Sequence, residues 1–113
     1  MSNRTPNLLL EDIKESAERI LEYIKDLSFD EFSKDNRTID AVIRNFEIIG
    51  EASNLLPDEI KDKYPQIDWH RIRGFRNRVV HDYFGVDLQI VWKITIDQIP
   101  GLLSEIVRII RHF

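Results

Sequence analysis

A histidine and several arginines lie close together in one short stretch of the sequence, residues 69–81. Four residues separate Arg76 from His81, and Asn77 stands four positions before His81, on the same face of an expected helix. Histidine exchanges a proton near neutral pH, and the guanidinium group of arginine binds phosphate through bidentate hydrogen bonds. These groups suit attack of a ribose 2′-hydroxyl on its own phosphodiester. His81 would be the general base or acid, Arg76 would stabilise charge on the phosphate oxygens, and Asn77 would orient the histidine or the phosphate.

The same stretch is a concentrated positive patch on an acidic protein. It has no acidic residue and includes Arg73 and Arg78 beside Arg76, whereas the whole chain has 16 Lys and Arg against 20 Asp and Glu, a net charge of −4. We therefore expect any contact with RNA to be local, with Arg73 and Arg78 as supporting phosphate ligands. The alternative is an ordinary solvated helical face.

A helical projection places Arg76 in the middle of an apolar stripe, with Asn77 and His81 on its polar flank. Arginine on such a stripe lies either in a wet cleft or against an acidic partner, because a buried unpaired charge is costly. Glu47 or Glu51 of the neighbouring helix could be that partner. The apolar residues of the stripe are Trp69, Ile72, Val79, Val80 and Tyr83.

The rest of the sequence predicts the helices that must position these groups. Apolar residues recur at steps of three and four rather than alternately, and hydrophobic residues make up 42% of the chain. We predict one all-α domain over residues 1–113, an up-and-down bundle of four to five helices. Long helices are expected at 6–27, 38–56, 69–83 and 88–110, the last bent near Pro100, with short helical turns at 28–36 and 57–64.

Several classes of protein are disfavoured by what the sequence lacks. It contains no cysteine and only three histidines, without a metal-binding spacing, so we expect no metal and no cofactor. No run of apolar residues is long enough for a membrane span and no secretory signal is evident, which makes the cytoplasm the expected location. The helix at 88–110 has apolar residues almost around its circumference, and this predicts a second copy of the chain as partner, in a homodimer.

Two motifs resemble a known family. The first is Arg76, four residues, His81, one residue and Tyr83, continuing to Asp87, and the second is the stretch 44–52, Arg-Asn-Phe-Glu-Ile-Ile-Gly-Glu-Ala. Together with Phe29 to Phe32 and Pro100, they are similar to the HEPN-domain toxins of the HepT type over nearly the whole chain.

The resemblance implies a dimeric helical bundle and a metal-independent endoribonuclease that arrests growth, with Arg76 and His81 as the catalytic pair. It also implies a minimal nucleotidyltransferase as antitoxin, which silences the toxin by adenylylating Tyr83. The sequence leaves open two alternative functions in which the protein does not cleave RNA. One is a helical binding partner that regulates such a nucleotidyltransferase, and the other is a structural dimer whose arginines pair with acids across the interface.

Overall fold

The protein is built from helices joined by short turns. A computed structural model describes residues 4–75 and 88–113, and within these ranges it contains no strand. This confirms the predicted all-α class. The helices are α1 (Pro6–Ile24), α2 (Phe29–Ser33), α3 (Asn36–Leu55), α4 (Asp58–Lys63), a helical segment at 69–75, α6 (Leu88–Asp97) and α7 (Ile99–Arg111).

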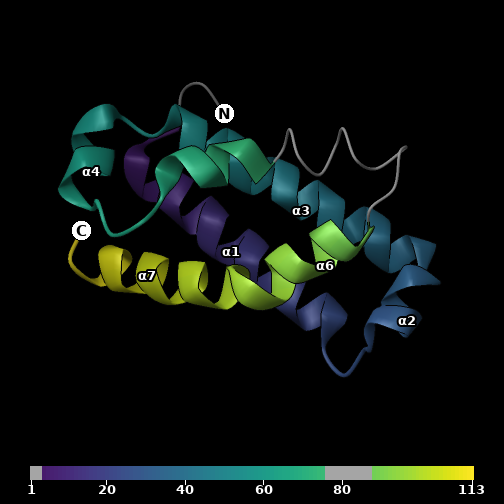
Figure 1. Cartoon of the computed structure of the whole chain (residues 1–113). Helices are drawn as coiled ribbons and strands as arrows, with labels where there is room; N and C mark the ends of the chain where they lie inside the picture. The colour runs from purple at the N-terminus through teal and green to yellow at the C-terminus, as the bar shows by residue number, and fades with distance from the viewer. Residues whose placement is uncertain (1–3, 76–87) are drawn as a thin grey trace.

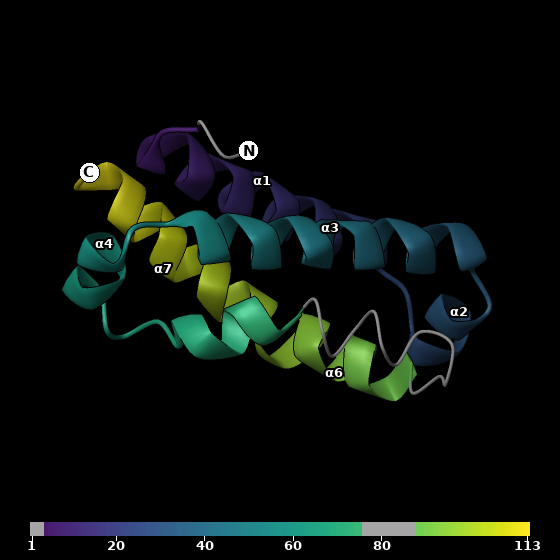
Figure 2. The same ribbon diagram turned by 90° about the horizontal axis from the view of Figure 1, so that it is seen from above.

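The long helices pack side by side around one core. Helix α1 contacts α3 most extensively and α7 next, while α7 also packs on α6. Figures 1 and 2 show α6 and α7 following one another along one side of the bundle, with α2 at one end and α4 at the other, near the C-terminus. The helical segment 69–75 lies between α4 and the described start of α6 in the chain.

The core forms because the apolar stripes of the helices face one another. In α1 the buried residues recur every three or four positions, which puts them on one face of the helix. Helices α3 and α7 present similar stripes, and burial of such side chains stabilises the fold by about 25 cal/mol per Å² of apolar surface. The fully buried side chains include Leu10, Ile13, Ile20, Phe46, Ile49, Ile99 and Ile106.

Two helix boundaries differ from the sequence prediction. Helix α1 ends at Ile24 rather than Leu27, because Asp26 adopts a left-handed backbone with φ of 64°, which cannot continue a right-handed helix. Helix α3 begins at Asn36 rather than Thr38. The Asp35 side chain accepts hydrogen bonds from the backbone N–H and the hydroxyl of Thr38, and these bonds lower the pKa of the Asp35 carboxyl.

The expected single helix at 88–110 is two helices, and most of its apolar surface is covered within the chain. The break is at Gln98, and Pro100 lies in the first turn of α7, where its missing N–H costs no hydrogen bond. The Trp92 ring on α6 lies 6.1 Å from Phe29 and 5.1 Å from Phe32 of α2, measured between ring centroids. Ile96 is 45% exposed. The apolar excess that suggested a dimer is thus smaller than expected, and dimerisation stays a prediction.

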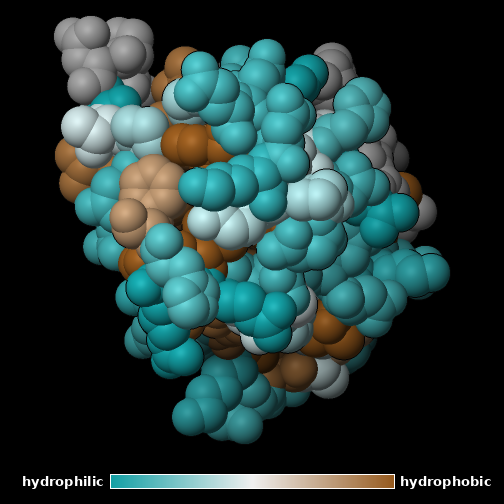
Figure 3. All heavy atoms as spheres, turned by 90° about the vertical axis from the view of Figure 1, so that its left-hand side faces the viewer, coloured by the Kyte–Doolittle hydropathy of each residue, from teal (hydrophilic) through white to brown (hydrophobic). Residues whose placement is uncertain are grey.

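The surface at the α4 end of the molecule is largely polar. Figure 3 shows that face covered mainly by hydrophilic residues, with apolar residues in separate small areas. Among the helices of the described ranges, none combines the length and the hydropathy that crossing a bilayer requires.

Candidate active site

The helical segment 69–75 leads directly into the predicted catalytic residues, and its start is firmly held. The Asp68 side chain caps the segment by accepting a hydrogen bond from the backbone N–H of Arg71, with 3.0 Å between nitrogen and oxygen. The indole N–H of Trp69 donates to the carbonyl of Tyr64 at 3.1 Å. The described part of the helix expected at 69–83 thus begins at the predicted residue.

One face of this segment is anchored in the core. Trp69 is 8%, Ile72 5% and Phe75 1% exposed. The Phe75 ring meets the ring of Phe46 on α3 edge to face, with centroids 5.4 Å apart and an interplanar angle of 90°. The apolar stripe through Trp69 and Ile72 is confirmed. Phe75 was missing from it, although its position three residues after Ile72 is a signal that the sequence contains.

The opposite face of the segment is polar and open to solvent. His70, Arg71 and Arg73 are all exposed. The Nε of Arg71 lies 3.9 Å from an Asp68 oxygen, a long contact between two side chains that are more than half exposed, so it contributes little to stability. This part of the segment therefore presents positive charge at the surface, as expected of a phosphate-binding helix, and Arg73 is accessible for the predicted role.

Most of the predicted site lies outside the described residues. Arg76, Asn77, Arg78, His81 and Tyr83 all fall within residues 76–87, so their predicted roles stay predictions based on the sequence. The predicted acidic partners of Arg76 are described: Glu51 on α3 is exposed, and half-buried Glu47 has an oxygen 3.9 Å from an Arg44 nitrogen.

The second motif, residues 44–52, forms the middle of α3 and divides into an inner and an outer face. Phe46, Ile49 and Gly50 are buried in the bundle, whereas Arg44 and Glu51 are exposed. The Phe46–Phe75 contact joins this motif to the segment that precedes Arg76. The second motif and the described segment directly before the first motif are thus neighbours in space, although Phe46 and Phe75 are far apart in the chain.

Asn45, in the same motif, is a polar residue with only 5% exposure. Its amide nitrogen donates to the carbonyl of Ala41 at 2.8 Å, while its side-chain oxygen accepts no hydrogen bond from the described residues. Leaving a buried acceptor without a partner costs about 1–3 kcal/mol. The motif therefore includes a buried amide oxygen whose hydrogen-bonding need is not met by the described residues.

The described residues give no indication of a metal centre. Within residues 4–75 and 88–113, no three side chains of the His, Cys, Asp or Glu types gather closely enough to hold a metal ion.

Comparison with known proteins places the whole chain in one group. A family model described as ribonuclease HepT-like matches residues 13–109. The chain is 40% identical over 111 residues to a candidate RNase of Methanocaldococcus jannaschii, an alignment covering 98% of this chain and 92% of that protein. It is 42% identical over 96 residues to a candidate ribonuclease HepT of Thermococcus cleftensis, covering 85% and 87%. No solved structure matches the chain significantly.

Proposed function

The chain belongs to the ribonuclease HepT-like family, and from that premise we propose that it is a metal-independent endoribonuclease toxin that cuts RNA with Arg76 and His81. Ribonuclease activity follows from the family itself. The catalytic residues, the toxin role and the control by a partner are the proposal. The observation that supports it best is the Phe46–Phe75 contact. It holds the helical segment 69–75, which directly precedes Arg76 in the chain, on the bundle, while Arg71 and Arg73 of this segment are exposed.

The proposed reaction is an internal transfer at phosphorus. The ribose 2′-oxygen forms a bond to the adjacent phosphorus and loses its proton to a histidine, while the bond from phosphorus to the 5′-oxygen of the next nucleotide breaks and that oxygen gains a proton. Arg76 stabilises the negative charge that accumulates on the phosphate oxygens. The products are a 2′,3′-cyclic phosphate and a 5′-hydroxyl, and no step calls for a metal.

A dimer would complete this site. In a two-fold dimer the His81 side chains of both subunits can meet at one cleft, so that one histidine is the base and the other the acid. Arg73 and Arg78 would then bind the phosphates on either side of the cut, with Asn77 orienting His81 or the phosphate. The exposed side chain of Arg73 is compatible with that role.

Incubating the purified protein with RNA in EDTA tests the proposed reaction. We expect cleavage products with cyclic phosphate and 5′-hydroxyl ends, in amounts that EDTA does not change. Loss of cleavage in EDTA that is restored by added Mg²⁺ would contradict the metal-independent mechanism. A folded protein that binds a nucleotidyltransferase and leaves RNA intact would favour the regulatory binding partner instead.

We further propose that Tyr83 is the control point of the toxin. A minimal nucleotidyltransferase acting as antitoxin would transfer an adenylyl group from ATP to the phenolic oxygen and release pyrophosphate. Tyr83 is seven residues from Arg76, two turns along a helix, so the attached phosphate can reach the arginine and compete with RNA.

Co-expression with the partner nucleotidyltransferase tests this control. We expect a mass increase of one adenylyl group on the wild type and none on Tyr83→Phe, together with loss of RNase activity in the modified protein only. Full activity in protein that is stoichiometrically modified at Tyr83 would exclude the proposed inhibition.

A further inference from the structure

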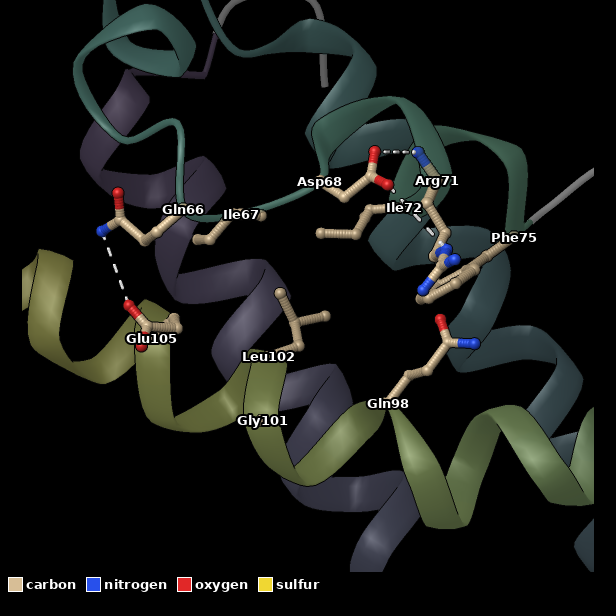
Figure 4. A pocket seen from close by; sticks show the side chains of 10 residues that line it. All are labelled: Gln66, Ile67, Asp68, Arg71, Ile72, Phe75, Gln98, Gly101, Leu102 and Glu105. Carbon is tan, nitrogen blue, oxygen red and sulfur yellow. Dashed lines mark hydrogen bonds and ion pairs between the residues drawn. The ribbon is translucent and has the colours of Figure 1, made fainter.

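A cavity of about 340 Å³ lies between the stretch 66–75 and the first turns of α7. Figure 4 shows the cavity with the helical segment 69–75 on one side and α7 on the other. Its volume is at the small end of the range for ligand sites, about 300–1,000 Å³, so it suits a single flat ring system with a few polar groups.

The walls of the cavity are largely preformed. Four core side chains supply the apolar surface, and each is less than a tenth exposed, which means that their positions are set by packing within the bundle. A flat aromatic ring gains apolar contact on such walls without disturbing the fold. The four side chains are Ile67, Ile72, Phe75 and Leu102.

Hydrogen-bonding groups converge at one end of the cavity. Figure 4 shows the Gln98 side chain extending from the start of α7 toward Arg71 on the opposite wall. Although Gln98 is the N-cap residue of α7, its side chain makes no capping hydrogen bond. Arg71 has only the 3.9 Å contact with Asp68 among the ion pairs of the described residues. Both side chains are therefore available to a ligand.

At the other end of the cavity, a weak interaction joins the two walls. The side-chain nitrogen of Gln66 donates to a carboxylate oxygen of Glu105 at 3.5 Å, the longest separation that still counts as a hydrogen bond. A ligand group that donates two well-aligned hydrogen bonds can take the place of Gln66. The carboxylate of Glu105 is thus an acceptor positioned across the cavity from Arg71.

The charges of the lining disfavour a phosphate. The described lining has one cation, Arg71, and two carboxylates, Asp68 and Glu105. A phosphate would meet no excess of positive charge here. A neutral ring with acceptors on one edge and donors on another matches the lining better.

We propose that this cavity binds a guanine base. The guanine acceptors O6 and N7 face the donors of Arg71 and Gln98, and the guanine N1–H and N2–H₂ groups donate to Glu105. Adenine has an amino group where guanine has O6, which places a donor against Arg71, and the pyrimidines lack the second ring that fills the cavity. The base belongs either to a single-stranded RNA or to a free nucleotide.

For an RNA base, the inference rests on the proposed ribonuclease function. Phe75, which lines the cavity, directly precedes Arg76 in the chain, so a wall residue is the sequence neighbour of the proposed catalytic arginine. A guanine held in the cavity would fix the register of the strand and select which phosphodiester is cut. Bases of RNA are available for such contacts when they are unstacked in single strands.

Nucleotide binding tests the cavity independently of catalysis. The test is an NMR titration that follows the amide signal of Gly101 and the Nε–H signal of Arg71. Each of four nucleotides is added in a separate titration: the 5′-monophosphates of guanosine, adenosine, cytidine and uridine. We expect saturable shifts with the guanosine nucleotide at the lowest concentration, and binding about tenfold weaker or more in Arg71→Gln and Gln98→Leu. Arg19→Gln, which removes an exposed charge on α1, should bind as the wild type does.

Two variants at Gly101, one that fills the cavity and one that does not, distinguish loss of ligand binding from loss of folding. A Cβ at Gly101 meets no atom within 4 Å, so alanine fits, while leucine projects its side chain from the cavity wall. We expect Gly101→Leu to lose guanosine binding and Gly101→Ala to retain it, with both variants folded. Equal binding of all four nucleotides, or no shift at millimolar concentration, would overturn the inference.

Cleavage of short RNAs with one guanine in an adenine and uracil background distinguishes the two sources of the base. Cuts at a fixed distance from the guanine in the wild type, with that fixed distance lost in Gln98→Leu, identify the base as part of the RNA. Guanosine monophosphate binding with cuts that ignore guanine assigns the cavity to a free nucleotide. If the wild type binds guanosine monophosphate and cuts no RNA, the proposed function fails and the cavity assignment stands.

Discussion

His81→Ala is expected to lower the rate of RNA cleavage by about two to four orders of magnitude, the usual contribution of a general acid or base. In the proposed mechanism the histidine provides the proton transfers at the 2′- and 5′-oxygens, and alanine can provide neither. The measurement is the initial rate on a defined RNA, followed by the appearance of cyclic phosphate ends. In cells we expect expression of the wild type to arrest growth and expression of the variant to leave growth unaffected.

The matched control is His70→Ala, which removes an exposed histidine on the segment 69–75. We expect this variant to retain most of the activity. A His81→Ala protein with wild-type cleavage rates would remove His81 from the mechanism. Mixed dimers with one His81→Ala subunit refine the test, because full activity would show that the two histidines do not share the roles of acid and base.

Phe75→Ala is expected to destabilise the fold by about 3–5 kcal/mol, the usual cost of removing a buried phenylalanine side chain. Phe75 is 1% exposed, and its ring contacts Phe46 edge to face. The loss also detaches the helical segment 69–75 from α3, so RNase activity should fall even at temperatures at which the variant remains folded. Urea denaturation followed by circular dichroism measures the stability, and the cleavage assay measures the activity.

Tyr23→Ala is the control for loss of an aromatic ring, since Tyr23 is 40% exposed on α1 and its removal should change stability by less than about 0.5 kcal/mol. Combining Phe75→Ala with Phe46→Ala should cost less than the sum of the two single changes, because the rings contact each other. Additive costs, or a Phe75→Ala protein as stable and active as the wild type, would contradict the role given to this contact.

Much of the fold could be predicted from the sequence because its determinants are local. The spacing of apolar residues in α1 and α3 predicted amphipathic helices, and the helix expected from residue 69 begins there, capped by Asp68. The differences are at places where one residue's backbone or a distant contact decides. The left-handed conformation of Asp26 ended α1 early. Phe29 and Phe32 cover part of the Trp92 surface within the chain, and dimerisation stays a prediction.

The residues of the candidate site were likewise only partly identified from the sequence. Arg76, Asn77 and His81 were identified from their types and spacing, and Tyr83 from the family resemblance. All four stay predictions because they lie outside the described residues. Phe75 and Gln98 were not singled out. The position of Phe75 three residues after Ile72 is a helical signal in the sequence, whereas Gln98 has no distinctive local pattern. The contacts of both residues depend on what faces them across the bundle.

Residue types and the period of the helix are enough to establish the helical class, the basic character of residues 69–81 and the spacing of the two motifs. The folded structure adds that Phe46 of the second motif packs on Phe75, the residue before Arg76, and that Arg71 and Gln98 face one another across a cavity. The physical reason is that such contacts depend on the packing of segments far apart in the chain, where shape and burial select the partners and sequence spacing contains no record of them.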